Sequence, residues 1–270
     1  GAKIAKGEYL IFLNNDTIQQ ADWIEPLVNK LNSNINISSI QPKIKNYNHR
    51  DRFDYAGGCG GEMDIFGFPY TRGRIFNTIE TDTGQYDSTQ EIFWASGTAF
   101  MTRKSIFFKA CRFDDTLFAH MEEIDYHWKC HLMGYKVMSA PESVIYHMGG
   151  KTLDYQSPYK TYLNHRNSFL LLLTNYSIPM AAYLFFPRLV LEIFSGIYEL
   201  AKGRFGHLLA IIKSLFWLLF HPHIIIKRIV LTRKLRKIKD RKIIQSFYLG
   251  SIAWCYFILK RETFTTIIKK

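Results

Sequence analysis

The stretch EYLIFLNND, residues 8–16, decides the fold class because it joins an apolar run to a polar turn. The run from Tyr9 to Leu13 is almost continuously apolar, which predicts a short strand buried on both faces of a parallel sheet. It stops at the polar triplet Asn14-Asn15-Asp16. Ligands of open α/β sheets bind beyond the carboxyl ends of strands, so this triplet is a candidate ligand-binding turn.

The residues after this turn alternate between helical and strand patterns. Apolar residues at helical spacing predict a helix over 21–34, and ISSIQPKI predicts a second strand over 37–44. Residues 46–91 hold seven glycines and no sustained periodicity, which predicts an ordered, loop-rich excursion. This order of elements indicates an α/β domain.

The same domain continues to residue 150. Apolar alternation over 91–107 leads into a helix start, and residues 125–132 are predicted to be helical with Gly134 as the C-cap. Two further patterns, at 135–141 and 143–150, predict two closing strands.

Beyond Thr161 the sequence is strongly apolar and helical in pattern, with segments at 163–177, 180–200 and 205–226. A membrane-spanning helix needs about 20 predominantly apolar residues. Charged residues (Arg188, Glu192 and Lys213) interrupt the candidates, which predicts interfacial rather than spanning helices. Residues 227–242 then carry nine Lys/Arg and one Asp among apolar residues, a pattern typical of a basic amphipathic segment on anionic lipid.

Charge and composition separate the two parts of the chain. The net charge of +12 arises from −3 over residues 1–150 and +15 over residues 151–270. The basic part therefore meets a polyanion, either a nucleic acid or an anionic membrane. A hydrophobic content of 47% argues against disorder, and four scattered cysteines without a CxxC pair indicate neither a zinc site nor a disulfide scaffold. A reducing, cytosolic setting is expected.

Three places carry candidate chemistry, each with a plainer alternative. Asp16 with its amide neighbours suits Mg²⁺ or Mn²⁺, which take oxygen ligands, although Asn and Asp also favour turns. The cluster Glu122-Glu123-Ile124-Asp125 either stabilises a helix N-terminus or supplies a general base with a raised pKa. His147 at a strand end beside glycines is either a core histidine or a group that reaches a metal or diphosphate.

The motifs taken together resemble family 2 glycosyltransferases, and more narrowly the rhamnosyltransferase-like enzymes of bacterial cell-surface polysaccharides. The resemblance covers about residues 1–175 and rests on several segments in order, namely AKGEYLIFLNNDT, GGCGGEMDIFGFPYTRGRIF, FWASGTAFMTRKSIF, FDDTLFAHMEEIDYHWKCHLMGYKV and VIYHMGGKTL. It implies a GT-A fold, a Rossmann-like mixed α/β sheet, as the catalytic domain over residues 1–160. Residues 161–270 are expected to form an α-helical, basic, membrane-associating region.

The resemblance also implies roles for individual residues. Asp16 matches the metal and diphosphate ligand of a DxD-like motif, with Asn14 and Asn15 flanking the nucleotide sugar. Glu123 falls on the position of the catalytic base, supported by Glu122 and Asp125, and His147 matches a histidine that helps to hold the metal. The acceptor or diphosphate side would be lined by Arg72, Arg74, Ser96 and Gly97, unless the glycines serve only turns.

For Trp94 and for the pair Arg166-Asn167, the sequence is compatible with either a functional or a purely structural role. Trp94 either stacks on a sugar face or belongs to the core. The pair Arg166-Asn167 resembles a recurrent pair that follows the catalytic domain in these enzymes, and its alternative is a helix-surface pair.

The sequence departs from the family pattern at two points. Glu stands at the base position, which is usually Asp, so the acceptor is expected to sit one methylene farther away. The family begins with a strand-helix-strand-helix half that binds the nucleotide base, and this chain opens at Gly1 where that half should have ended. We therefore expect an N-terminally truncated chain that lacks its base pocket.

The expected function is inverting, metal-dependent transfer of a sugar from a UDP- or dTDP-sugar to a hydroxyl of a glycan or lipid-linked acceptor. The expected location is cytoplasmic and peripheral, on the inner face of an anionic membrane, with no nucleic acid bound. Three alternatives stay open: a glycoside hydrolase, a basic nucleic-acid- or membrane-binding module, and a non-catalytic remnant. Adjacent carboxylates argue against the hydrolase, whose carboxyl pair stands about 5–9.5 Å apart across the bond.

Overall fold

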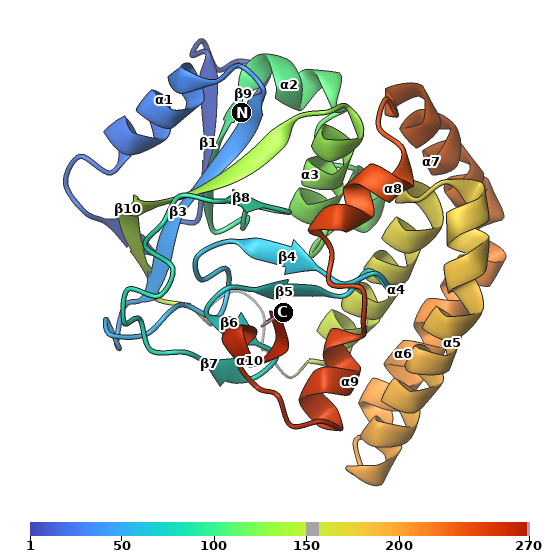
Figure 1. The fold of residues 1–270 in the computed structure, drawn as a ribbon. Helices are drawn as coiled ribbons and strands as arrows, with labels where there is room; N and C mark the ends of the chain where they lie inside the picture. Colours follow the sequence, from blue (N-terminus) through green and yellow to red (C-terminus); the bar gives the residue numbers. More distant parts are fainter. Residues whose placement is uncertain (150–156, 269–270) are drawn as a thin grey trace.

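The larger of two sheets forms the frame of the protein, whose computed structural model describes residues 1–149 and 157–268. Its strands follow the order β1-β9-β3-β10-β2, with β8 paired to β10 (Figure 1). The strands are β1 (Tyr9–Leu13), β2 (Thr17–Gln19), β3 (Ile37–Asn46), β8 (Glu91–Ile92), β9 (Ala99–Arg103) and β10 (Lys136–His147). β3 and β10 pair in parallel, and the other pairs are antiparallel, so the sheet is mixed.

The direction of the strands brings three strand ends to one edge of this sheet. β1 and β3 both pair antiparallel with β9, so β1, β3 and β10 all run in the same direction. Their carboxyl ends are Leu13, Asn46 and His147. Backbone hydrogen bonds connect the segments at this edge, because Met148 N–H donates to Asp16 O (2.9 Å) and Tyr47 N–H donates to His147 O (3.0 Å).

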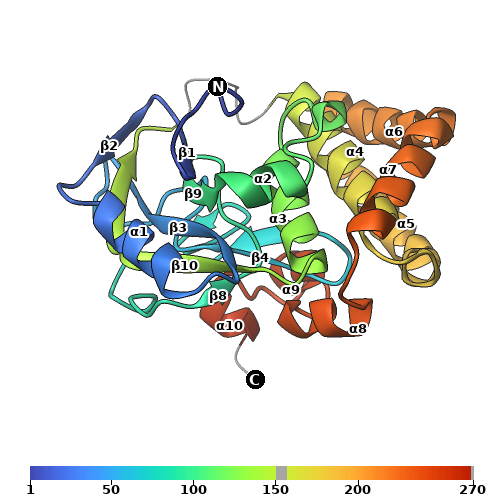
Figure 2. The ribbon, with the colours of Figure 1, turned by 90° about the horizontal axis from the view of Figure 1, so that it is seen from above.

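Helices cover both faces of the large sheet because successive strand residues point to opposite sides. On one face, Leu27 and Leu31 of α1 (Ile24–Ser33) pack with Ile40 and Met101. On the other face, Phe100 packs with residues of α2 (Lys104–Lys109) and α3 (Glu122–Leu132). Figure 2 shows α3 between the sheet and the C-terminal helices.

The predicted elements of this part are largely present, with two corrections. β1 is not buried on both faces of a parallel sheet: it is an edge strand that pairs antiparallel with β9, and its Ile11 and Leu13 are exposed. The strand, helix and second strand expected after residue 8 are β1, α1 and β3, and Gly134 follows α3 with a φ of 93°. The two expected closing strands are one strand, β10, whose pairing with β3 shifts register between Ala140 and Val144. Pro141 lies at this shift and has no N–H to donate. In the segment VIYHMGGKTL, residues 150–153 lie outside the described residues.

The glycine-rich excursion contains a second, smaller sheet rather than loops alone. Its four short strands, β4 (Gly61–Met63), β5 (Pro69–Thr71), β6 (Arg74–Ile75) and β7 (Thr78–Ile79), pair in sequence order. Gly61 ties this sheet to the segment before β9, because it accommodates the indole of Trp94 where a Cβ would lie 2.0 Å from the ring. Strands of two or three residues carry no detectable periodicity, which explains why the sequence did not predict them.

The C-terminal part is helical, as expected. The longer helices are α4 (Pro158–Asn175), α5 (Ile178–Ala201), α6 (Phe205–Phe220) and α7 (Pro222–Leu235). Short helices come after them: α8 (Asp240–Ile243), α9 (Ile252–Phe257) and α10 (Phe264–Ile268), with 3₁₀ turns η1 (Asp115–Leu117) and η2 (Ile244–Ser246). The helix expected over 205–226 is divided at His221, where Pro222 begins α7.

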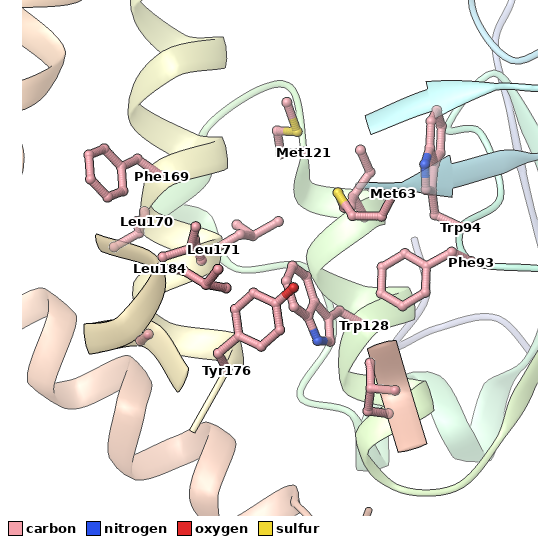
Figure 3. Close-up of a cluster of buried hydrophobic side chains, with 14 of the residues drawn as sticks. Met63, Phe93, Trp94, Met121, Trp128, Phe169, Leu170, Leu171, Tyr176 and Leu184 are labelled. Carbon is pink, nitrogen blue, oxygen red and sulfur yellow. The ribbon is translucent and has the colours of Figure 1, made fainter. Parts of the chain in front are cut away.

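These helices share a hydrophobic core with the sheet-bearing part of the chain. Figure 3 shows Trp128 beside Tyr176, in a cluster that also holds Phe93 from before residue 160 and Leu170 and Leu171 from after it. The rings of Trp128 and Tyr176 meet edge to face with 5.0 Å between centroids. The division into 1–160 and 161–270 stays a prediction, and the shared core means that removing the helices would expose the flank of α3.

Helix α5 carries its charges inward and its apolar side chains outward. Arg188 and Glu192 are fully buried and paired with each other, and Arg188 also donates to Phe66 O (2.7 Å). The outer side chains, which are 48–74% exposed, are Tyr183, Phe186, Val190, Ile193, Phe194 and Ile197. The sequence pattern predicts that Arg188 and Glu192 interrupt the apolar segment. In the structure they face inward and leave the outer apolar face of α5 uninterrupted.

Candidate functional site

His147 lies between two carboxylates at the carboxyl edge of the large sheet. Its Nδ1 lies 2.9 Å from Asp54 Oδ1, and its Nε2 lies 3.2 Å from Asp16 Oδ1 and 3.5 Å from Asn14 Nδ2. The histidine ends β10, Asp16 follows β1, and Asp54 lies in the loop after β3. Parallel strand ends thus bring together residues that are far apart in the sequence.

The electrostatics of this edge favour an imidazole held in a fixed orientation. Burial alone would lower the pKa of His147, but the carboxylates of Asp54 and Asp16 outweigh it and raise the pKa above its ordinary value. Asp54 is itself buried and also accepts the Ala56 N–H (2.7 Å). The sequence did not predict Asp54. This residue lies in a loop eight positions after the end of β3, and no local pattern shows that the loop comes back to the sheet edge.

Glu122 and Glu123 occupy the first turn of α3, after a strained loop. Three non-glycine residues with positive φ precede them: Phe118 (63°), His120 (64°) and Met121 (74°). Such backbone conformations cost free energy and persist only where the surroundings impose them. This loop therefore sets the direction in which both carboxylates leave the helix.

Gly97 links Glu123 to the turn that carries Asp16. A Cβ added at Gly97 would lie 3.7 Å from the carboxyl carbon of Glu123. The next residue, Thr98, accepts the Asn14 N–H through its carbonyl oxygen (2.9 Å). Residues 97–98 therefore stand between the acidic helix start and the Asn14–Asp16 turn, so the predicted base and the turn that carries Asp16 flank one short segment.

The two glutamates differ from surface carboxylates in their proton affinity. Burial raises the pKa of Glu123 to about 8, the neighbouring Glu122 adds to the rise, and backbone N–H groups such as that of Gly97 oppose it. Burial also raises the pKa of Glu122. One oxygen of each carboxyl group is buried without a hydrogen-bond partner among the described residues. Such a group is suited to accept a proton near neutral pH.

Arg166 and Asn167 of α4 hold the strained loop in place. The Nη2 of Arg166 donates to Leu117 O (2.9 Å), and the amide of Asn167 donates to the carbonyl oxygens of Leu117 (3.0 Å), Ala119 (3.0 Å) and His120 (2.8 Å). Both side chains are buried. The pair is thus a buried support of the loop before Glu122, which argues against the helix-surface interpretation.

Asp125 faces the C-terminal helices rather than the sheet edge. Its carboxylate contacts Arg228 of α7 (2.7 Å), Lys129 (2.6 Å) and Asn175 of α4 (2.9 Å). Burial would raise the pKa of Asp125, but Arg228 and Lys129 outweigh it and lower the pKa to about 2. The expected position of Asp125 beside the substrate is therefore corrected: its carboxylate attaches α3 to α4 and α7.

Three other expected site residues are also structural. Trp94 is 5% exposed and donates its indole N–H to Glu62 O (2.8 Å) within the core, which argues against stacking on a sugar. Arg72 is buried and donates to Cys59 O (2.7 Å) and Ser139 Oγ (2.8 Å). Ser96 is buried and donates to Ala56 O. Burial keeps all three side chains from a substrate.

The remaining expected residues lie at or near the surface. Asn14 and Asn15 are exposed in the turn after β1. The guanidinium of Arg74 lies over the ring of Tyr55, 4.2 Å from its centroid. The described residues hold no group of three or more His, Cys, Asp and Glu side chains arranged for a metal ion.

Comparison with known proteins finds a family match for the first part of the chain. Residues 1–109 match the family model of glycosyl transferase family 2. The match includes Asp16, Asp54 and Gly97 and ends before Glu123 and His147. A search of curated proteins finds no match.

One solved structure to which the chain is similar is the crystal structure of GalNAc-T7 with UDP, GalNAc and Mn²⁺. The two share 17% sequence identity with a TM-score of 0.44, over 69% of this chain and 39% of the GalNAc-T7 chain. This chain thus spans well under half the length of that protein.

Replacing Asn167 by Asp tests the support of the strained loop. Asn167→Asp keeps the shape but removes the donor, so the loop loses three hydrogen bonds, although Leu117 O still accepts from Arg166. We expect a loss of about 1–3 kcal/mol in the free energy of unfolding, and faster amide hydrogen exchange in residues 116–124. Asn164→Asp, three positions earlier on the same helix, is the control and should change stability by less than about 0.5 kcal/mol. Equal effects of the two substitutions would contradict the assigned support.

Proposed function

We propose that this protein is the catalytic part of a glycosyltransferase, which transfers a sugar from a nucleoside-diphosphate sugar to a hydroxyl group of an acceptor. The observation that carries the proposal is the half-buried Glu123 carboxylate with its raised pKa, set beside Gly97 and across residues 97–98 from the Asp16 turn. The match of residues 1–109 to glycosyl transferase family 2 supports it.

The arrangement around His147 suits a divalent cation. A metal-bound histidine usually donates its second ring N–H to a carboxylate, and Asp54 is placed to accept from Nδ1 while Nε2 faces Asp16. Mg²⁺ and similar ions are commonly held by one or two carboxylates together with substrate phosphates and water. Asp16 and His147 would hold Mg²⁺ or Mn²⁺ here, and the ion would offset negative charge on the departing diphosphate.

In the proposed reaction Glu123 acts as the general base. Its carboxylate takes the proton of the acceptor hydroxyl, whose oxygen forms a bond to the anomeric carbon while the bond from that carbon to the diphosphate breaks. The nucleoside diphosphate leaves with the electron pair of that bond. A single displacement of this kind inverts the anomeric centre.

The finer assignments remain part of the proposal. We propose a UDP- or dTDP-sugar as donor, and a glycan or lipid-linked sugar in cell-surface polysaccharide synthesis as acceptor. The rhamnosyltransferase-like subtype rests on the sequence motifs.

Glu123→Gln in the full-length protein tests the assigned base. We expect turnover to fall by about 10²–10⁴-fold, while binding of the donor and of Mn²⁺ survives, because the amide cannot accept the proton but keeps the shape. In the unsubstituted protein, kcat/KM should rise with pH through the raised pKa of Glu123, because only the carboxylate form accepts the proton. Glu122→Gln removes a neighbouring negative charge, so this rise should move to lower pH. Near-normal turnover of the Glu123→Gln variant would rule out the base.

We further propose that the C-terminal helices bind an anionic membrane, at its cytoplasmic face. Six apolar side chains of α6 are 40–69% exposed, like those of α5: Phe205, Leu209, Ile212, Phe216, Leu219 and Phe220. Among the nine Lys/Arg of residues 227–242, Arg228 and Arg236 are tied into the fold and the other seven are exposed. An apolar face bordered by exposed basic residues matches an anionic lipid surface.

The length of the helices also permits a deeper position in the membrane. Within the described part of the chain, α5 is the one helix long and apolar enough to cross a bilayer. The pair α6 and α7, bent by 72°, would be a second if it counts as one span.

Sedimentation with vesicles tests the membrane proposal. We expect the protein to sediment with vesicles that contain anionic lipid and to lose most of this binding when Phe194→Glu and Phe216→Glu are combined, because charge disfavours insertion of the apolar face. Ile35→Glu, at an exposed apolar residue remote from these helices, is the control and should bind as before. Unchanged binding of the double variant, or binding to nucleic acid instead of vesicles, would overturn the proposal.

A further inference from the structure

A cleft with a volume of about 560 Å³ opens beside the His147 edge of the sheet. One wall comes from the sheet edge and its loops and includes Asp54 and Tyr55. The opposite wall comes from the C-terminal helices and includes Thr161 of α4, Tyr198 of α5 and His207 of α6. The cleft therefore forms where the helices stand against the sheet edge, and its far wall lies beyond residues 1–109.

Aromatic rings and polar groups both line the walls of this cleft. The ring of Tyr198 lies 5.1 Å from that of Phe257 in α9, between ring centroids. Thr161 Oγ1 and His207 Nδ1 lie 2.8 Å apart and hold each other in place. Flat apolar rings beside a few fixed polar groups are the usual lining of a small-molecule site.

The charges on the walls are matched in pairs. Glu199 pairs with Arg204 (2.7 Å) at the turn between α5 and α6, and Asp54 pairs with His147. A diphosphate needs cationic partners that are available to it. The cleft therefore suits an uncharged ligand rich in hydroxyl groups better than the diphosphate of the donor.

We propose that this cleft binds the neutral sugar ring of the acceptor, an inference that rests on the proposed function. The cleft adjoins Asp54, which holds His147, so a sugar bound there stands next to the edge where the donor diphosphate is proposed to lie. Its far wall is the α5–α6 turn, and these same helices carry the outer apolar side chains. An acceptor sugar attached to a membrane lipid reaches the site along this wall.

Saturation-transfer difference NMR of the full-length protein tests the cleft without any turnover. The probes are methyl β-D-glucopyranoside, methyl β-D-galactopyranoside and methyl α-L-rhamnopyranoside. We expect a signal with at least one probe, and at least a tenfold weaker affinity after Tyr198→Ala or after Asn77→Trp, which fills the cleft from an exposed position. Tyr183→Ala, on the outer side of the same helix, is the matched control and should keep the signal.

The outcomes separate this inference from the proposed function. Two results would overturn the proposed sugar site: no saturation-transfer signal with any of the three sugars, or a signal that persists in both Tyr198→Ala and Asn77→Trp. Retention of sugar binding by Glu123→Gln is expected, because that residue is assigned to chemistry and not to this wall. If Glu123→Gln keeps normal turnover while the cleft variants lose the sugar, the proposed base fails and the cleft stands.

Discussion

The parallel pairing of β3 with β10 is the constraint on which the rest of the structure depends. It fixes the carboxyl ends of β1, β3 and β10 at one edge of the sheet, because β9 is antiparallel to both β1 and β3. His147, Asp16 and Asp54 meet there although up to 131 positions separate them in the chain. A shift of one residue in β10 would turn His147 to the other face and leave the two carboxylates without their partner.

The helical part of the chain completes this arrangement from the other side. The first turn of α3 places Glu123 beside Gly97, while Asp125 anchors the same turn to Arg228 and Asn175. Removing one partner from a buried ion pair leaves an uncompensated charge, which is strongly destabilising. The α5 helix thus has two different faces: its charged side chains point into the protein, and its apolar side chains point away from it.

Local patterns in the sequence predicted those parts of the fold that local physics determines. The apolar run of β1, the polar turn after it and the amphipathic α1 were all visible in the spacing of residues. The position of His147 at a strand end was predicted as well, and the structure puts it beside Asp16. The contributions of Asp54, Arg166 and Asn167 were not, because each depends on contacts across 30 or more positions that no local pattern records. Trp94 and Arg72 could be taken for ligands because sequence alone does not show burial.

A crystal soaked in Mn²⁺ and inorganic pyrophosphate would test the central claim most directly, by anomalous diffraction from the metal. If the sheet edge is a diphosphate-handling site, a peak will lie at bonding distance from both the Asp16 carboxylate and His147 Nε2, with His147 Nδ1 still donating to Asp54 and Glu123 free of the metal. A peak at a different place, or an edge that stays without metal while Asp16 and His147 remain bonded to each other, would contradict the account.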